Sequence, residues 1–145
     1  KLNFKKRSNM ENNELRIGNF VRLNNPKYHP ENTGKNFMVD SIKSDDVSLI
    51  DYENLPAIIL YQYLKYIEPI ELTEEWLLKF GAKWDSDFVV LEVNKLKIRT
   101  HLPNMKPASV FAYFDGIRIK QLKYVHELQN LYYAINGTDL KCGGF

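Results

Sequence analysis

Short apolar runs separated by polar residues fill the first half of the chain, a pattern typical of short strands joined by turns. The runs lie at residues 15–23, 37–42, 47–50, 57–61 and 63–67. Gly18 and Asn19 interrupt the first run, and Pro56 confines the start of the fourth to a sheet edge. Strands at this spacing predict a small β-barrel of the SH3-like type over residues 14–70.

Two helices are predicted farther along the chain, at residues 73–80 and 124–136. Thr73 is a suitable N-cap for the first, and Gly81 and Gly137 stand just past the two ends, where a left-handed residue commonly closes a helix. The second helix has apolar residues spaced to face one core. They are Val125, Leu128, Leu131, Tyr132 and Ile135.

Strict alternation between the two helices predicts two β-hairpins. Asn94-Lys95 separates strands at 88–93 and 96–102, and Asp115-Gly116 separates strands at 110–114 and 117–121. The expected fold class is therefore α+β. After the barrel come a linking helix, a four-stranded antiparallel sheet and a C-terminal helix that covers it, all within residues 71–140.

The two-residue loops also predict the strand register, which decides which side chains share a face of the sheet. In the first hairpin, Leu91 should pair with Ile98 and Val93 with Leu96. In the second, Tyr113 should lie opposite Arg118, and Phe111 opposite Lys120. The remaining face of the second hairpin should pack in a core with the last helix. The residues expected in that core are Ile117, Ile119, Leu91, Ile98, Leu128, Leu131 and Ile135.

One face of the predicted sheet gathers basic and aromatic side chains. They are Lys97, Arg99, Phe111, Tyr113, Arg118 and Lys120. Because cations neutralise phosphates and rings stack on bases, this combination suits single-stranded nucleic acid. An ordinary solvent-facing sheet surface also carries such cation–aromatic pairs. The residues leave both interpretations open.

The two ends of the chain lack any periodic pattern. Residues 1–13 are polar and basic and are interpreted as a flexible tail, in which Lys5, Lys6 and Arg7 form a second candidate binding site. Residues 141–145 are expected to be a short mobile tail. It contains Cys142, the one cysteine of the chain, which excludes an intramolecular disulfide and a multi-cysteine metal site within one chain.

Charge is unevenly distributed, although the formal net charge is only +2. Residues 1–39 carry eight basic and three acidic residues, 40–92 carry four and twelve, and 93–145 carry eight and three. This asymmetry indicates either distinct surfaces or an acidic middle that pairs with the basic ends. The chain is 44% hydrophobic but has no apolar run of about 20 residues, so we expect a globular cytoplasmic protein that does not span a membrane.

Residues that would support catalysis are sparse. His29, His101 and His126 have no second ligand at metal-binding spacing, and no glycine-rich phosphate-binding loop is present. Asp85-Ser86-Asp87 fits turn chemistry better than a pair of catalytic carboxylates. The sequence therefore predicts no enzyme, no metal and no cofactor.

Three stretches resemble a family of small proteins carried by bacterial phages and prophages. They are residues 72–81 (LTEEWLLKFG), 124–134 (YVHELQNLYYA) and 14–19 (ELRIGN). The resemblance extends over about residues 11–140, and the family brings no established catalytic residues. It implies a role in host takeover or counter-defence, such as inhibition of an RNA-guided CRISPR nuclease.

The expected function is thus that of a non-enzymatic accessory protein that binds a host protein or protein–RNA complex in the bacterial cytoplasm, as an anti-CRISPR-type inhibitor does. The alternative is a stand-alone nucleic-acid-binding protein that uses the basic and aromatic sheet face. Ionic strength distinguishes the two, since direct binding to nucleic acid weakens steeply with salt.

Overall fold

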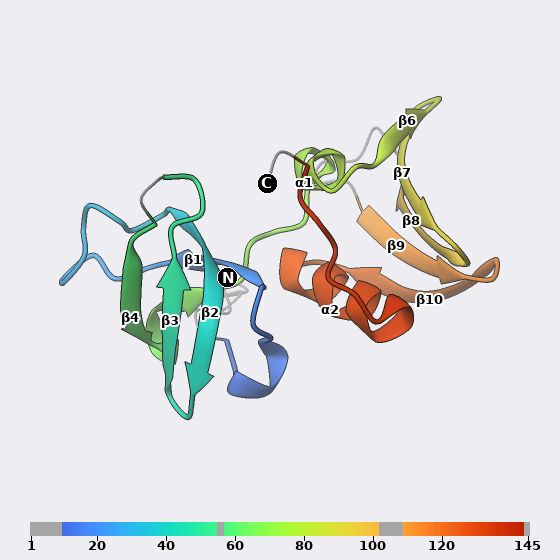
Figure 1. Cartoon of the computed structure of the whole chain (residues 1–145). Coiled ribbons are helices and arrows are strands. Elements are labelled where there is room, and N and C mark those ends of the chain that lie inside the picture. Colours follow the sequence, from blue (N-terminus) through green and yellow to red (C-terminus); the bar gives the residue numbers. More distant parts are fainter. Residues whose placement is uncertain (1–9, 55–56, 102–108, 144–145) are drawn as a thin grey trace, which may run out of the picture. The chain divides into compact units, whose positions relative to one another are not determined.

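The chain divides into two units, Lys1–Ile70 and Glu71–Phe145. The computed structural model describes residues 10–54, 57–101 and 109–143. Each unit contains an antiparallel sheet, and the second also contains both α-helices (Figure 1). The α+β class predicted from the sequence is confirmed.

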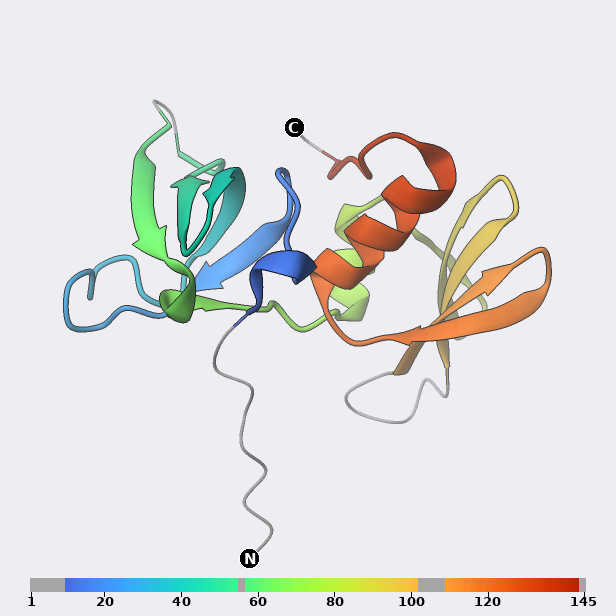
Figure 2. The ribbon, with the colours of Figure 1, turned by 90° about the horizontal axis from the view of Figure 1, so that it is seen from below.

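Five strands form the sheet of the first unit in the order β4-β3-β2-β1-β5. Their bounds are Phe20–Leu23 (β1), Asn36–Lys43 (β2), Asp46–Ile50 (β3), Ile59–Tyr63 (β4) and Ile67–Glu68 (β5). A one-turn 3-10 helix, η2 (Leu64–Tyr66), connects β4 to β5. The sheet is curled rather than flat (Figure 2).

The concave core of the first unit is built from alternate residues of these strands. Val21 lies opposite Phe37, and Val39 lies opposite Leu49, and all four are at most 1% exposed. Met10 is also buried in this core, so the folded part begins earlier than the sequence indicated, with a further 3-10 helix, η1 (Asn12–Glu14). The candidate site at Lys5, Lys6 and Arg7 lies outside the described residues.

The sheet of the second unit has the order β10-β9-β8-β7-β6. Its strands are Lys83–Asp85 (β6), Phe88–Val93 (β7), Leu96–His101 (β8), Ser109–Phe114 (β9) and Ile117–Leu122 (β10). The sequence predicted four of these strands and missed β6. All three residues of β6 are exposed, so the strand leaves no alternation of buried and exposed positions to detect.

The two α-helices begin and end close to the predicted residues. In α1 (Glu74–Lys79) the Thr73 hydroxyl accepts a hydrogen bond from the Trp76 backbone N–H at 3.3 Å. The second helix, α2 (Val125–Asn136), ends at Gly137, whose φ of +72° is the left-handed conformation that favours glycine. In the described part of the second unit, α1 packs on β7 and α2 on β10.

The core under α2 differs from the predicted one. Leu128 and Ile98 are fully buried, whereas Leu131 and Ile135 are only half-buried. Ile117 and Ile119 are 69% and 46% exposed, so the prediction that they line this core is wrong. Both residues lie in β10, an edge strand of the sheet, in which the first five residues are all exposed.

The described end of the chain is docked on the second unit. The Gly143 N–H donates a 2.7 Å hydrogen bond to the Lys79 carbonyl, and Cys142 is 8% exposed. Residues 141–143 are therefore part of the fold and not a mobile tail. Within the ranges described above, no helix has both the length and the apolar character needed to cross a membrane.

Candidate functional site

The candidate site lies on one face of the second sheet, where three neighbouring strands align. Strand β8 pairs Lys97 with Tyr113 and Arg99 with Phe111 of β9, and Tyr113 in turn lies opposite Arg118 of β10. The register of the first hairpin agrees with the prediction. The structure thus brings five of the predicted residues together, and we call the side of the sheet that carries Lys97, Arg99, Phe111, Tyr113 and Arg118 the cation–aromatic face.

Lys120 does not belong to this face, which corrects the prediction. The ladder between β9 and β10 shifts by one residue, so Lys120 pairs with Ala112 and Gln121 takes the position opposite Phe111. Alternate residues point to opposite sides of a sheet, so Lys120 lies on the side of buried Ala112. There its ammonium is 3.0 Å from the carboxylate of Glu127 on α2.

Two arginine guanidinium groups on the cation–aromatic side of the sheet lie over aromatic rings. The guanidinium carbon of Arg118 is 4.2 Å from the ring centroid of Phe111, and an Nη2 hydrogen bond of 3.3 Å joins it to the Tyr113 hydroxyl. The guanidinium carbon of Arg99 is 4.4 Å from the centroid of Phe88. Such contacts favour a delocalised, weakly hydrated cation and restrict its side-chain rotamers.

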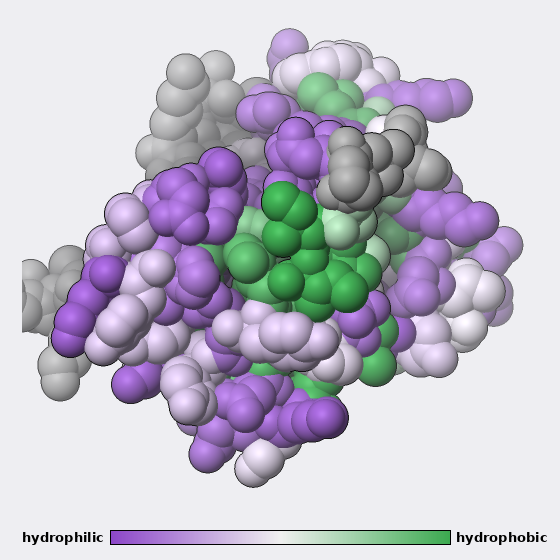
Figure 3. Space-filling model, turned by 60° about the vertical axis from the view of Figure 1, so that its left-hand side comes forward, coloured by the Kyte–Doolittle hydropathy of each residue, from purple (hydrophilic) through white to green (hydrophobic). Residues whose placement is uncertain are grey.

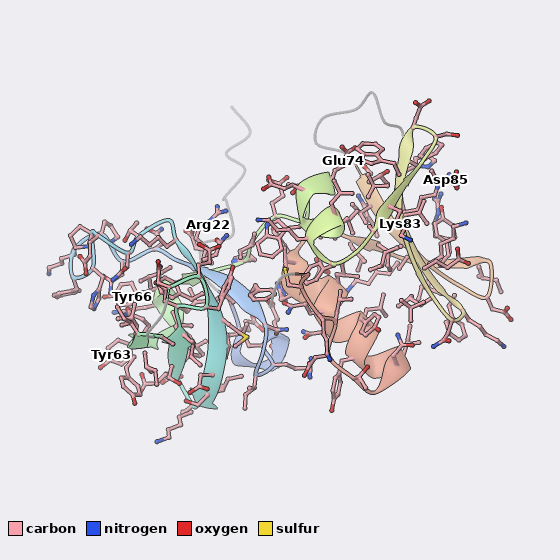
Figure 4. The ribbon with its side chains drawn as sticks, turned by 45° about the horizontal axis from the view of Figure 1, so that its top comes forward. Arg22, Tyr63, Tyr66, Glu74, Lys83 and Asp85 are labelled. Carbon is pink, nitrogen blue, oxygen red and sulfur yellow. The ribbon has the colours of Figure 1, made fainter. Side chains whose placement is uncertain are left out.

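The charge of the face is mixed rather than uniformly positive. Glu92 lies opposite Lys97, and β6 adds Lys83 and Asp85, which pair with Val90 and Phe88 on the same side of the sheet. Lys83 and Asp85 are labelled on their strand in Figure 4. Four cations and two carboxylates therefore share this side among the described residues.

Two nitrogen atoms of β8, on the same side of the sheet, have no hydrogen-bond partner in the described part of the chain. Arg99 Nε and His101 Nδ1 are inaccessible to solvent and have no hydrogen-bond partner there. The His101 ring is held edge-on against Phe111, with 5.6 Å between centroids. An unmet buried donor costs roughly 1–3 kcal/mol, a cost that is recovered when the side chain reorients toward an acceptor.

A hollow of about 580 Å³ opens beside the cation–aromatic face, at the end of the sheet where the two hairpins turn. Lys95, Lys97 and Arg99 line it together with Glu92 and Tyr113. The hollow therefore places cations around a space that an acidic side chain from a partner can enter.

The first unit contains a second hollow, of about 770 Å³, which the sequence did not predict. Tyr28, Tyr61, Tyr63 and Tyr66 line it, and Lys65 extends over the rings of Tyr63 and Tyr66. Figure 4 shows Tyr63 and Tyr66 near each other at the end of β4. The available signal was the spacing of tyrosines in residues 61–66, which we interpreted only as strand and connection.

The described residues give little support for a metal site or for a reactive nucleophile. No three His, Cys, Asp or Glu side chains among them come together in a way that would hold a metal ion. Burial raises the pKa of the Cys142 thiol, and the nearby Lys79 lowers it to a smaller extent. Burial thus disfavours the reactive thiolate.

Comparison with known proteins adds no family. No family model matches the chain, and no curated protein or solved structure matches it significantly.

Proposed function

We propose that the chain is a non-enzymatic binding protein that engages a carboxylate-bearing surface of a protein partner through the cation–aromatic face. The observation that carries this proposal is the stacking of Arg118 on Phe111 and of Arg99 on Phe88, at 4.2 and 4.4 Å. A planar guanidinium group binds a carboxylate through two parallel hydrogen bonds. Because stacking already orders both side chains, less conformational entropy is lost when they bind.

Three observations favour a protein over single-stranded nucleic acid. The guanidinium groups occupy faces of the Phe88 and Phe111 rings, on which bases would have to stack. Lys120 points to the other side of the sheet, which removes one cation from a phosphate path. Glu92 and Asp85 are on the same side as the arginines, and a face of mixed charge matches a protein surface that carries both signs better than a uniformly anionic phosphate backbone.

The resemblance to phage- and prophage-borne proteins supports a bacterial host complex as the partner, with binding in the cytoplasm. An RNA-guided nuclease is the first such complex to test, with this protein acting as a counter-defence inhibitor. This part of the proposal rests on the resemblance and on no residue of the site.

The first unit is proposed to be an SH3-like barrel. Its strand order, the long connection between β1 and β2, and the single 3-10 turn between β4 and β5 all support this assignment. The curled sheet is compatible with it as well.

The experiment is a pull-down from bacterial lysate, with and without nuclease treatment, that compares the wild type with Arg118→Ala and Lys120→Ala. The two substitutions each remove one cation from β10, but from opposite sides of the sheet. We expect a protein partner that survives nuclease treatment to be lost with Arg118→Ala, because its carboxylates lose their guanidinium. Lys120→Ala is expected to retain the partner.

Equal capture by the two variants would remove the cation–aromatic face from consideration. Capture that disappears with nuclease, together with binding of the purified protein to single-stranded RNA that weakens steeply with salt, would instead support the nucleic-acid alternative. Circular dichroism of each variant shows whether the fold is retained.

A further inference from the structure

Strand β4 is an edge strand whose outward backbone groups are not paired with another strand. In the ladder with β3, the Asp51 N–H donates to the Ile58 carbonyl at 3.0 Å, and the Leu64 N–H donates to the Asp45 carbonyl at 2.8 Å. Antiparallel partners alternate between hydrogen-bonded and non-hydrogen-bonded pairs. Residues 58, 60, 62 and 64 therefore face β3, and residues 59, 61 and 63 direct their N–H and C=O groups away from the sheet.

The same three residues present large apolar side chains to solvent. Ile59, Tyr61 and Tyr63 are 48%, 79% and 58% exposed, and alternation places all three on one face of the sheet. Figure 3, which turns the β4 side of the molecule forward, shows hydrophobic surface among the hydrophilic residues. Tyr63 is the N-cap of η2, so its carbonyl accepts the first hydrogen bond of that 3-10 helix. No described residue is bonded to the outward backbone groups of Ile59 and Tyr61.

The other described sheet edges carry the features that normally prevent strand pairing. Strand β5 has only two residues, β6 bears Lys83 and Asp85, and β10 bears two cations and an irregular register. Short length, charge and bulges are the usual protection of an edge. Strand β4 has none of them: its five residues, ILYQY, are uncharged, contain no proline and pair with β3 without a shift.

We propose that β4 pairs antiparallel with β4 of a second copy of this chain. A two-fold axis at Tyr61 sets Tyr61 opposite its own copy and Ile59 opposite Tyr63 of the second copy. In this register Tyr61 exchanges two backbone hydrogen bonds with its own copy, and the Tyr63 N–H of each chain meets the Ile59 carbonyl of the other. The Tyr63 carbonyl, which already accepts a bond in η2, has a second lone pair for the Ile59 N–H. The two five-stranded sheets become one ten-stranded sheet. The interface is self-complementary, as a two-fold contact requires.

Side-chain chemistry favours a second copy as the occupant. Rows of Ile and Tyr facing each other across paired strands are favourable, and no like charges meet, because β4 is uncharged.

Sedimentation of the full chain over a range of concentrations tests this pairing. We expect a monomer–dimer equilibrium in the wild type, and Tyr61→Lys should raise the dissociation constant at least about tenfold, because it sets two ammonium groups opposite each other. Ile117→Lys makes the same apolar-to-cation change at a 69% exposed position of the β10 edge and should leave the equilibrium unchanged.

Disulfide cross-linking tests the register. Tyr61→Cys should form a dimer under mild oxidation, since paired Cα atoms lie about 5.5 Å apart. Tyr63→Cys should not, because two copies of residue 63 are then four residues apart along the strands, about 13 Å, beyond the reach of a disulfide. The wild type, which has only buried Cys142, gives the background.

A chain that stays monomeric at every concentration overturns the proposal, as does a dimer that Tyr61→Lys does not weaken or equal cross-linking of the two cysteine variants. These measurements contain no partner protein or nucleic acid. The outcome is therefore independent of the function proposed for the cation–aromatic face.

Discussion

Arg118 and Lys120 are two residues apart on β10, and a regular strand would place both on the same face. Ile119 between them has no partner in the β9 ladder, so Lys120 lies on the helix side. There the carboxylate of Glu127 contacts Lys120 and accepts the backbone N–H groups of Lys123 and Tyr124, at 3.1 and 3.0 Å. The sequence could not show this, because Arg118, Ile119 and Lys120 continue the alternation without interruption.

Cys142 carries a prediction that follows from its burial. A raised pKa leaves a smaller fraction of thiolate near neutral pH, so iodoacetamide should modify the folded chain more slowly at pH 8 than the same chain in urea. The folded-state rate should keep rising as the pH passes above the ordinary thiol pKa of about 8.5. Mass spectrometry of the modified fraction over time gives both rates.

Lys79 provides the control for this prediction. Its charge lowers the Cys142 pKa, so Lys79→Ala should slow the modification of the folded chain further. Since the folded state holds the thiol proton more tightly, its contribution to stability is present below the ordinary thiol pKa and is lost as the pH rises through the raised value. Equal modification rates in folded and urea-treated chains would contradict the assigned burial.

At the scale of elements, the sequence predicted the hairpin turns and the helix ends, because the residues at those positions determine them. Asn94 and Asp115 adopt positive φ values of 55° and 50° in two-residue turns, the conformation that hairpins of this length require. The helix ends were equally readable from Thr73 and Gly137. Strand β6 could not be predicted in this way, because it pairs only with β7 at the edge of the sheet and buries none of its side chains.

The packing of α2 leads to a second prediction. Leu128 is fully buried, so Leu128→Ala should lower the free energy of unfolding by about 2–5 kcal/mol. Leu131 is half-buried, and Leu131→Ala should cost less, because partly exposed side chains leave a smaller cavity. Urea denaturation of both variants, monitored by circular dichroism, measures the difference.

A loss in Leu131→Ala as large as that in Leu128→Ala would mean that the helix packs with a different face. The informative result is which of the two variants loses more free energy of unfolding, because the comparison is between neighbouring leucines on one helix. Conserved far-ultraviolet spectra in both variants would confirm that the comparison is between folded proteins.

At the scale of the whole molecule, each unit has a sheet and buried side chains of its own. Leu49 is 0% exposed in the first unit and Ile98 is 0% exposed in the second. We expect calorimetry to resolve two unfolding transitions, with Leu49→Ala lowering the melting temperature of one and Ile98→Ala that of the other. Each substitution removes about 2–5 kcal/mol from the stability of its own unit.

A single transition that both substitutions shift equally would show that the two units unfold as one. Wild-type scans at several heating rates serve as the reference, because irreversible unfolding makes the apparent midpoint depend on the rate.

The candidate site shows where sequence reasoning stops at this scale. The two short turns were enough to predict which residues share one face: Lys97, Arg99, Phe111, Tyr113 and Arg118. The stacking of the arginines on the rings did not, because it depends on rotamers set by neighbouring strands. Three tyrosines of the hollow in the first unit lie close together in residues 61–66, but Tyr28 and residues of β2 and β3 complete it, and no local pattern brings these distant parts together.

Each sheet contains one residue that has no partner in the pairing of its strands. Asp40 has no partner between the pairs formed by Val39 and Ser41, just as Ile119 has none on β10. Deleting one residue from a regular strand turns every following side chain to the other face. Deletion of Asp40 or Ile119 instead leaves all other pairs in place, so β2 and β10 can each lose a residue at this position in evolution and keep their sheets.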